Sequence, residues 1–419
     1  MMNTNSGPRH VAIIGAGIVG LSVAWFLQEA GVDVTVLERS EVGVGSSWGN
    51  AGWISPGLSI PLPEPSVLRY GLKSILDGDS PLYVPPTFDP GIWRFLVNFA
   101  RHCNMRDWKS AMGALMALNR LAIPAYEQLA QAEEGLEVHT APIVAAFRNS
   151  SEAAALLHEF EMIRSSGQAL ETSVLEGPQV REQVPQLSTD VGFAIRIDGQ
   201  RYIDPSTFTA ALAAAVTKRG GRILTGQAVT SIGRAMGRVA VSTAVGDVLR
   251  CDAAVVATGA WMNTLARGLG VKRQVQAGRG YSFVVPTSRP VPSPIYFPSV
   301  RVACTPSGSD ALRVAGTMEF RSPDAAFDAK RVMAIVRSAT PLLDEVDWSA
   351  RRLDWVGPRP VTGDGLPLIG ESAIPGVYIA GGHGMWGVTL GPATGQELAR
   401  QIVEGKTPPE LLPFLPTRR

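Results

Sequence analysis

Three glycines near the start of the chain, Gly15, Gly17 and Gly20, have the spacing G-x-G-x-x-G directly after a short apolar run. The first permits a tight turn, the second lets the backbone approach a pyrophosphate, and the third lets a helix pack closely on a strand. Glu38 follows a second apolar run, where its carboxylate can accept hydrogen bonds from ribose hydroxyls and disfavours a 2′-phosphate. Because a helix over residues 18–30 aims its free amides at the phosphates, this order predicts a dinucleotide site.

Two glycine-rich segments near the other end of the chain predict loops over the reactive ring of that dinucleotide. Residues 357–370 read GPRPVTGDGLPLIG, and residues 381–395 read GGHGMWGVTLGPATG. A helix predicted to start near Gly391 and to close at Gly405 directs its positive end at the preceding loop, where it stabilises negative charge on a reduced flavin. If both regions serve one cofactor, the chain is wrapped around it, and the sequence indicates a flavin oxidoreductase.

The composition narrows the class of protein. The chain has 419 residues, 45% of them hydrophobic and 18% charged, which fits two well-buried domains, and its formal net charge of +1 implies no nucleic-acid partner. Its three cysteines form no C-x-x-C pair and its five histidines are scattered, so we expect no metal site and a reducing, cytoplasmic compartment. Residues 11–32 are apolar enough for a signal peptide or membrane anchor, but the three glycines, Gln28 and Glu29 argue against both.

The order of predicted elements indicates an α/β fold with a discontinuous, Rossmann-like nucleotide domain. Residues 205–221 predict a helix that begins at a proline and ends at two glycines, and three short strands after it form a meander that returns to the nucleotide sheet. We assign residues 8–56, 199–272 and 356–408 to the cofactor domain, residues 57–198 and 273–355 to an α+β substrate domain with a mixed or antiparallel sheet, and residues 409–419 to a C-terminal tail.

Six motifs together carry a family likeness. They are GAGIVG with Glu38, GSSWGNAGWISPG at 45–57, GRGYSFVV at 278–285, ALRVAGTMEF at 311–320, and the two C-terminal segments. On these motifs the chain resembles the D-amino acid oxidase superfamily of FAD enzymes over nearly its whole length. Within it, the chain is most similar to bacterial D-amino acid dehydrogenases and to relatives that act on glycine-type amines. The resemblance implies a FAD-binding domain of the GR2 type.

The resemblance also implies a set of cofactor contacts that runs from the first glycine motif to the C-terminal loops. Along the pyrophosphate, ribose and adenine these are Gly15, Gly17, Ile18, Val19, Gly20, Glu38, Arg39, Ser46, Ser47, Val229, Thr258 and Gly259. Around the flavin ring these are Asn50, Ala51, Gly52, Gly382, His383, Gly384, Gly387, Val388 and Thr389.

A substrate site beside the flavin ring follows from the same resemblance, with Arg359, Tyr281 and His383 as the catalytic candidates. Arg359 matches the arginine that holds the substrate carboxylate, and the alternative is an ion pair with Asp354 or Asp364. Tyr281 is either a donor to the carboxylate or amine or an aromatic core residue, and His383 either donates to the flavin or caps its turn. Further candidates for substrate contact are Asn50, Trp386, Tyr296, Trp48 and Trp53.

Two departures from relatives bear on the substrate and the electron acceptor. Glycine oxidase has a carboxylate-binding tyrosine at a place that falls at about Ala303 in this chain. Monomeric sarcosine oxidase has a lysine that promotes reaction with oxygen where this chain has Arg313, and no cysteine lies in 357–370 to join the flavin. We therefore expect non-covalent FAD and consider a quinone as acceptor beside O2.

We predict that the protein oxidises the α-carbon–nitrogen bond of an amino acid, a D-amino acid first of all, by hydride transfer to flavin N5. The imino acid product would then be hydrolysed to a 2-oxo acid. Glycine, an N-substituted glycine, or a cyclic imino acid such as proline or hydroxyproline would fit the same site, whereas a large pocket would favour D-amino acids. An alternative of another class is a flavin-binding subunit of a larger dehydrogenase complex. A nicotinamide-dependent dehydrogenase is disfavoured because no second G-x-G-x-x-G appears.

A quinone acceptor would bring the protein to the inner face of the membrane as a peripheral contact. Residues 66–78, SVLRYGLKSILDG, have the mixed apolar and basic character of a surface-binding segment. A lid or an ordinary docked helix is the favoured interpretation of this segment. The sequence does not indicate an oligomeric state.

Overall fold

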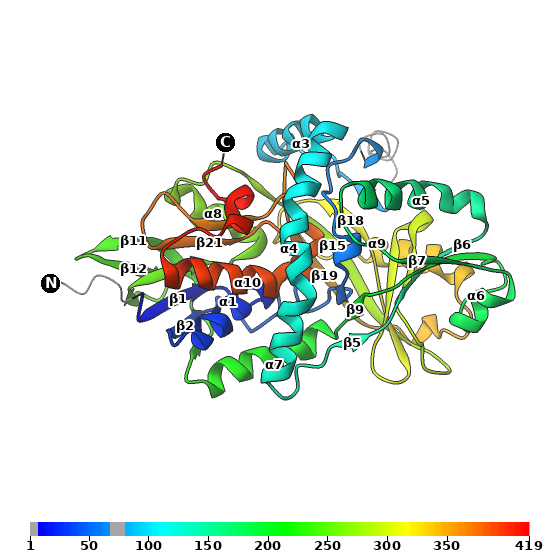
Figure 1. The fold of residues 1–419 in the computed structure, drawn as a ribbon, viewed down its shortest axis with the longest axis horizontal. Helices are drawn as coiled ribbons and strands as arrows, with labels where there is room; N and C mark the ends of the chain where they lie inside the picture. The colour runs from blue at the N-terminus through cyan, green and yellow to red at the C-terminus, as the bar shows by residue number, and fades with distance from the viewer. Residues whose placement is uncertain (1–6, 68–79, 419) are drawn as a thin grey trace.

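A six-stranded sheet carries the first glycine motif. The computed structural model describes residues 7–67 and 80–418, and its first sheet has the order β10-β2-β1-β14-β21-β20 (Figure 1). The strands are β1 His10–Ile14, β2 Asp33–Leu37, β10 Arg222–Leu224, β14 Ala253–Val256, β20 Leu368–Glu371 and β21 Val377–Gly381. All neighbours are parallel except β20 and β21. Runs such as VAII and AAVV form its centre because parallel strands are buried on both faces.

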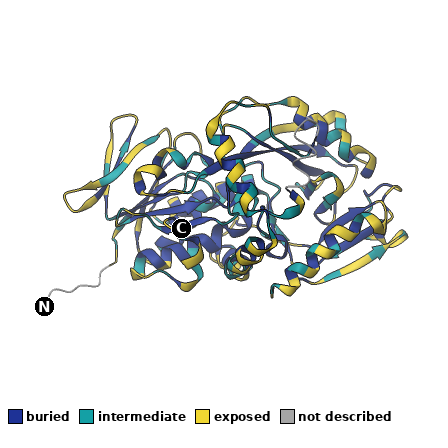
Figure 2. Ribbon diagram, turned by 90° about the horizontal axis from the view of Figure 1, so that it is seen from above, coloured by how far each residue is buried: buried dark blue, intermediate teal, exposed yellow. Residues whose placement is uncertain are grey.

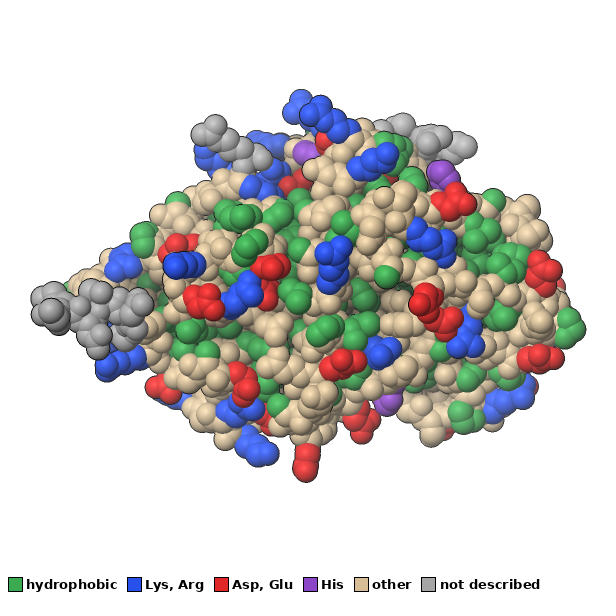
Figure 3. All heavy atoms as spheres, in the orientation of Figure 1, with side chains coloured by type: hydrophobic (Ala, Val, Ile, Leu, Met, Phe, Trp, Pro, Cys, Tyr) green, Lys and Arg blue, Asp and Glu red, His purple; other side chains and the backbone are tan. Residues whose placement is uncertain are grey.

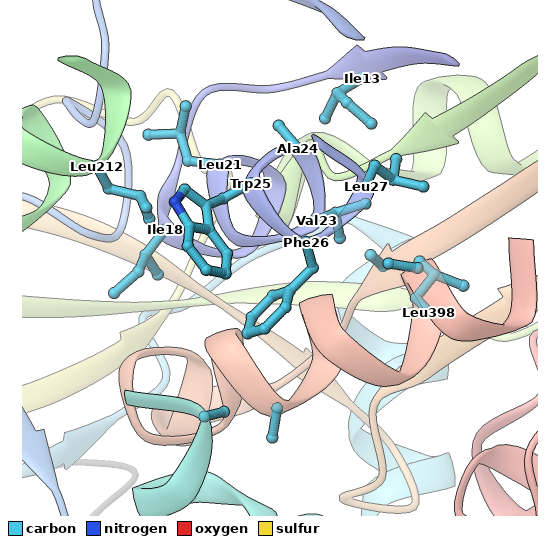
Figure 4. Close-up of a cluster of buried hydrophobic side chains, with 14 of the residues drawn as sticks. Ile13, Ile18, Leu21, Val23, Ala24, Trp25, Phe26, Leu27, Leu212 and Leu398 are labelled. Atoms are coloured by element: carbon cyan, nitrogen blue, oxygen red, sulfur yellow. The ribbon is translucent and has the colours of Figure 1, made fainter. Parts of the chain in front are cut away.

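Three helices pack together against this sheet: α1 Ile18–Glu29, α7 Pro205–Lys218 and α10 Gly387–Glu404. In Figure 4, Trp25 and Phe26 of α1 lie in one cluster with Leu212 of α7 and Leu398 of α10. Gly395 lets α10 cross α1 closely, because a Cβ there would lie 2.7 Å from the backbone of Ser22. The Rossmann-like FAD-binding fold predicted from the sequence is confirmed.

The second sheet has nine strands, eight of them in the order β19-β15-β18-β17-β16-β6-β8-β7, with β4 paired to β18. The strands are β4 Leu82–Tyr83, β6 Ile143–Phe147, β7 Thr172–Glu176, β8 Phe193–Ile197, β15 Val275–Pro286, β16 Ile295–Phe297, β17 Val302–Pro306, β18 Ala311–Phe320 and β19 Arg352–Thr362. Its pairs are antiparallel except β16 with β6 and β4 with β18, so the predicted mixed sheet is confirmed. The sequence assigns residues 356–408 to the cofactor domain. Because β19 pairs with β15, residues 356–362 are hydrogen-bonded into the second sheet instead of the nucleotide sheet.

Two small sheets complete the strands. Strands β11 Val229–Ala235, β12 Arg238–Thr243 and β13 Val248–Cys251 form a separate antiparallel sheet, so the predicted return to the nucleotide sheet is made by β14 alone. Strands β3 Trp53–Ile54, β9 Arg201–Tyr202 and β5 His139–Thr140 pair with one another. This last sheet joins segments from three distant parts of the chain.

Further helices surround the second sheet and its junction with the first (Figure 1). They are α3 Pro90–His102, α4 Met105–Ala132, α5 Ser150–Ser165, α6 Pro178–Gln183 and α9 Ala329–Ala339. The short helix α8 Asn263–Ala266 lies in the half of the first sheet, where Leu265 and Ala266 pack with its strands. The long helix α4 runs between the two halves of the molecule and packs on α10. It therefore supports the segment that the sequence assigns to the flavin ring.

Burial and surface charge agree with the composition. Buried residues concentrate in the sheets, whereas the outer faces of the helices and much of β11 are exposed (Figure 2). Basic and acidic side chains are interspersed on the face shown in Figure 3. In residues 7–67 and 80–418 no helix is long and apolar enough to cross a membrane. Most of the segment 66–78 lies outside the described residues.

Candidate active site

A cleft of about 340 Å³ opens at the carboxyl ends of the central strands of the first sheet. The predicted cofactor residues that line it are Gly15, Gly17, Ile18, Val19, Glu38, Arg39, Ser46, Ser47, Asn50, Val229, Thr258, Gly259, His383, Gly384, Gly387 and Val388. These residues come from segments at both ends of the chain and from its middle. The cleft has the place that ligands take in open α/β sheets, beyond the carboxyl ends of the strands.

The glycines of the first motif are required by close backbone approaches. Gly15 has a φ of +110°, and a Cβ there would lie 2.6 Å from the carbonyl oxygen of Ala257. A Cβ on Gly20 would lie 2.1 Å from the carbonyl oxygen of Gly15. Gly20 does not line the cleft, and it serves the packing of α1 on β1, as the motif predicts. The tight turn between β1 and α1 therefore forms only because these side chains are missing.

Glu38 is held in a fixed orientation at one end of the cleft. The amide of Ala16 donates to its Oε2 at 2.8 Å, and the amide of Ser40 donates to its Oε1 at 3.0 Å. The hydroxyl of Ser40 also donates to Oε1, at 3.3 Å. Because a carboxylate has about four acceptor positions, these three bonds leave capacity for about one further donor, such as a ribose hydroxyl.

The adenine end of the cleft combines predicted residues with neighbours that the sequence analysis missed. The predicted Thr258 has a buried hydroxyl with no hydrogen-bond partner among the described residues, so a ligand group can satisfy it. The guanidinium of Arg39 lies 3.8 Å from the ring centre of Trp261, which also lines the cleft. The tryptophan closes the run ATGAW, so its position after Gly259 was a usable signal. Other lining residues that were missed include Gln227, Ala228, Thr264 and Leu265.

The helix at the ring end begins at Gly387, four residues before the predicted start at Gly391. Pro392 lies inside this helix and has no amide to bond the carbonyl of Val388. The hydroxyl of Tyr126 on α4 donates to that carbonyl at 2.7 Å instead. The proline therefore does not mark the helix start, and the free amides of the first turn lie at the loop 382–387.

His383 is a buried, neutral residue of that loop. Its Nε2 shares a hydrogen bond of 2.9 Å with the Thr394 hydroxyl, and burial lowers the pKa of its imidazole to about 4. One ring nitrogen thus serves the packing of the loop on α10. Gly382, with a φ of +74°, forms the turn before it and does not line the cleft.

A second cavity, of about 230 Å³, adjoins the ring end of the cleft and shares Asn50 and Arg359 with it. Ala51 and Thr389 line this second cavity instead of the first, and so do the predicted aromatic residues Trp53, Tyr296 and Trp386. Trp48 lines neither cavity. Gly52 also lines neither, and it is fixed by packing because a Cβ there would lie 2.2 Å from the Ile203 carbonyl oxygen.

Arg359 lies where the two cavities meet, with its side chain across Gly280 of the neighbouring strand. A Cβ on Gly280 would lie 2.3 Å from the guanidinium carbon. Within the described part of the chain Arg359 has no hydrogen bond and no ion pair. The alternative partners are engaged elsewhere, because Asp354 binds Arg351 at 2.8 Å and Asp364 binds Arg418 at 3.0 Å. Burial lowers the pKa of Arg359 to about 10, which leaves it charged at neutral pH.

The structure does not bring Tyr281 to either cavity, which corrects its predicted contact with substrate. Its side chain is fully buried in the core of the second half of the molecule, where its hydroxyl donates to Glu319 at 2.7 Å. Burial and the neighbouring carboxylate raise the pKa of Tyr281 well above its ordinary value. It is the aromatic core residue that the sequence left as the alternative.

The two positions that depart from relatives also have clear places. Ala303 lines the second cavity, opposite Tyr296 on the neighbouring strand. Arg313 lines neither cavity, since its guanidinium lies 3.8 Å from the Asp204 carboxylate and 5.5 Å from the ring centre of Trp48. The described residues contain no cluster of side chains that could hold a metal ion.

Charged residues at the far end of the second cavity were not predicted. They are Glu64, Glu159 and Arg301, and they come from segments that the motifs do not cover. Helical periodicity gave no signal for Glu159, because it stands among polar and apolar neighbours in the run LHEFEM.

Comparisons with known proteins agree with this geometry. The family model described as DAO, FAD dependent oxidoreductase, matches residues 10–401. A D-amino acid dehydrogenase of Methylobacterium sp. (strain 4-46) is 32% identical over 411 residues, 95% of this chain and 96% of that protein. Glycine oxidase from Geobacillus kaustophilus has a TM-score of 0.75 at 22% identity, over 99% of this chain and 100% of that chain. L-proline dehydrogenase from P. horikoshii has a TM-score of 0.72 at 18% identity, over 99% and 98%. At these identities the two structures show the fold alone.

Proposed function

This chain belongs to the DAO family of FAD-dependent oxidoreductases, and from this premise we propose that it oxidises the α-carbon–nitrogen bond of an amino acid. A D-amino acid is the first choice of substrate, because the curated relative named above is a D-amino acid dehydrogenase. The oxidised product is an imino acid, which water hydrolyses to a 2-oxo acid.

The residues of the cleft fit FAD. The glycine turn before α1 leaves room for the pyrophosphate, Glu38 retains an acceptor position for a ribose, and the first turn of α10 faces the ring end. When bound, FAD supplies the hydride acceptor, N5 of its ring. We expect it to be held without a covalent bond, because residues 357–370 contain no cysteine.

The guanidinium of Arg359, which has no partner in residues 7–67 and 80–418, is the observation that carries the proposal. A guanidinium binds a carboxylate through two parallel hydrogen bonds and so fixes both its distance and its plane. With the carboxylate held at the junction of the cavities, the α-carbon is presented to the ring end of the cleft and the substrate side chain enters the second cavity. The main contribution of the chain is thus to hold the substrate α-carbon in position next to the flavin ring, which is what the reaction requires of the protein.

The size of the second cavity favours a substrate with a side chain over glycine, since about 230 Å³ exceeds what glycine fills. Glycine, an N-substituted glycine and a cyclic imino acid are the alternative substrates. A flavin-binding subunit of a larger complex is the alternative of another class, and an unpaired arginine facing a cavity argues against it. Either a quinone or O2 accepts the electrons, in a cytoplasmic protein.

Replacement of Arg359 tests the proposal. Arg359→Ala should lower kcat/KM for the amino acid substrate by roughly 2–5 kcal/mol, or about 30- to several-thousand-fold. The bound FAD, measured by its absorbance, should be retained because the arginine lies at the far end of the cleft.

Arg352→Ala is the matched control, because this arginine is exposed on the same strand and lines neither cavity. Its kinetics should equal those of the unmodified protein. Unchanged kinetics in Arg359→Ala would remove the carboxylate clamp and the proposal with it.

A further inference from the structure

We propose that the second cavity selects amino acids whose side chain ends in a cation, and that Glu159 of α5 is the residue that recognises this cation. The inference rests on the proposed function, because it takes the α-carboxylate to be held by Arg359. It adds the chemical class of the substrate's side chain, which the family and the motifs leave open.

Glu159 presents an unpartnered carboxylate to the cavity. It lines the cavity, and within residues 7–67 and 80–418 it has no hydrogen bond and no ion pair. Burial raises the pKa of this carboxyl to about 7, the neighbouring Glu64 adds to the rise, and Arg301 opposes it. A carboxylate withdrawn from water without a partner is costly, and a cation brought by a ligand would remove that cost.

The two ends of the cavity are far enough apart for a long side chain. The guanidinium of Arg359 lies across Gly280 on β15, and Tyr296 lies on β16, three strands further along the sheet. At about 4.8 Å per strand, the backbones below these two points are about 14 Å apart. Glu159 and Tyr296 line the same cavity, and the pKa of the Tyr296 phenol is raised by burial, to which the charge of Glu159 adds. Because Arg359 also lines this cavity, an extended side chain can lie between the arginine and Glu159.

The wall between the two ends is apolar. It is formed by Leu58, Ile60, Leu62, Leu156 and Met318. The cavity matches the parts of a basic amino acid in order. It has an arginine at one end, aliphatic residues along the wall and a carboxylate at the other end. The carboxylate of the amino acid meets the arginine, its methylene stem meets the wall, and its terminal amine meets Glu159.

The charges at the far end favour a cation over an anion. Two carboxylates, Glu64 and Glu159, face one guanidinium, Arg301, which has an interaction of its own. A substrate with an acidic side chain would bring a third carboxylate to this place. A neutral apolar side chain would cover the half-buried Glu159 and leave its carboxylate without a partner among the described residues.

The test compares lysine with norleucine, which has the same stem without the terminal amine. Both enantiomers of each are offered to the FAD-loaded protein under anaerobic conditions, and the rate of flavin bleaching gives kcat/KM. The protein should prefer lysine over norleucine of the same hand. In Glu159→Gln this preference should fall by about 10- to 100-fold, as expected for loss of a hydrogen bond to a charged group.

Glu161→Gln is the matched control, because Glu161 is exposed on the same helix and interacts with His158 at 3.9 Å. It should keep the full preference for lysine. Equal or faster reduction by norleucine in the unmodified protein would overturn the inference even if no variant folds. So would an unchanged preference in Glu159→Gln with normal FAD content. Failure of the proposed function is a different outcome, in which no amino acid bleaches the flavin.

Discussion

Arg359 and His383 both lie at the ring end of the cleft, the arginine half-buried and the histidine buried, yet they carry different charges. The guanidinium of Arg359 stays charged at neutral pH, because its pKa of about 10 lies well above neutrality. His383 is neutral, because burial lowers its pKa to about 4. The positive charge offered to a carboxylate at this junction therefore comes from the arginine, and the histidine contributes packing through Thr394.

The low pKa of His383 makes the stability of the protein depend on pH. Below pH 6.5 the unfolded chain binds a proton at this histidine, whereas the folded chain does not until the pH approaches 4. Stability is therefore lost as the pH falls through this window, by about 2 kcal/mol between pH 7 and pH 5. Urea unfolding of the unmodified protein and of His383→Gln at both pH values, in a fixed excess of FAD, measures this loss.

The variant should lose less stability than the unmodified protein over the same step in pH, and the difference should be about 2 kcal/mol. An equal loss in both proteins would show that this histidine is not held neutral by the fold. Because the comparison is a difference between two proteins, the other titrating groups cancel.

At the scale of elements, β15 positions Arg359 through its neighbour β19. All residues of β15 up to Val285 are buried, so the alternation of side chains does not reveal which face carries the site. A register shift between Gly280 and Tyr281 also interrupts the alternation against β18. These two features explain why the sequence left two interpretations of Tyr281 open, of which the structure supports the core residue.

Gly280 is predicted to control the position of Arg359. In Gly280→Ala the new methyl group would occupy the place of the guanidinium, which lies 2.3 Å from the ideal Cβ position. The arginine must move, and a misplacement of this kind should lower kcat/KM by about 100-fold. FAD content should stay normal.

Gly268→Ala is a suitable control for that variant, because a Cβ there meets nothing within 4 Å. Steady-state kinetics and flavin absorbance of both variants would distinguish displacement of Arg359 from a general effect of replacing a glycine by alanine. Normal kinetics in Gly280→Ala would mean that Arg359 does not work from the position seen across this glycine.

Tyr126 is predicted to stabilise the start of α10. Its hydroxyl serves the Val388 carbonyl that Pro392 leaves without an amide, and Tyr126→Phe would leave this buried carbonyl unsatisfied. The free energy of unfolding in urea should fall by about 1–3 kcal/mol. Tyr202→Phe should have little effect, since that hydroxyl makes no hydrogen bond in the described part of the chain. Equal stability of the two variants would contradict the role given to Tyr126.

At the scale of the whole molecule, the sequence predicted the fold where local signals and spacing agree. The strand, glycine turn, helix and acid of residues 10–38 lie as predicted, because each of these features is local. The discontinuous nucleotide fold and the mixed second sheet also follow from the motifs. The start of α10 was missed because a proline is an ordinary signal for a helix start, whereas Pro392 is tolerated inside through a distant tyrosine.

The polar end of the second cavity could not be predicted for a similar reason. Glu64, Glu159 and Arg301 are brought together only by packing of α5 and the loops over the second sheet. In the sequence each of them has the appearance of a solvated surface charge. The junction of the two cavities at Arg359 likewise depends on the approach of the two sheets, although the motif singled out this arginine as a candidate.

Anaerobic bleaching of the flavin is the most direct test of the central claim, that this chain uses FAD to oxidise amino acids through Arg359. The panel contains D- and L-amino acids, glycine, sarcosine and both enantiomers of proline, and air is readmitted afterwards to compare O2 with other acceptors. The account predicts that D-amino acids bleach the FAD-loaded protein and that Arg359→Ala greatly slows this bleaching. If none of these compounds bleaches the flavin while FAD is fully bound, the account is contradicted.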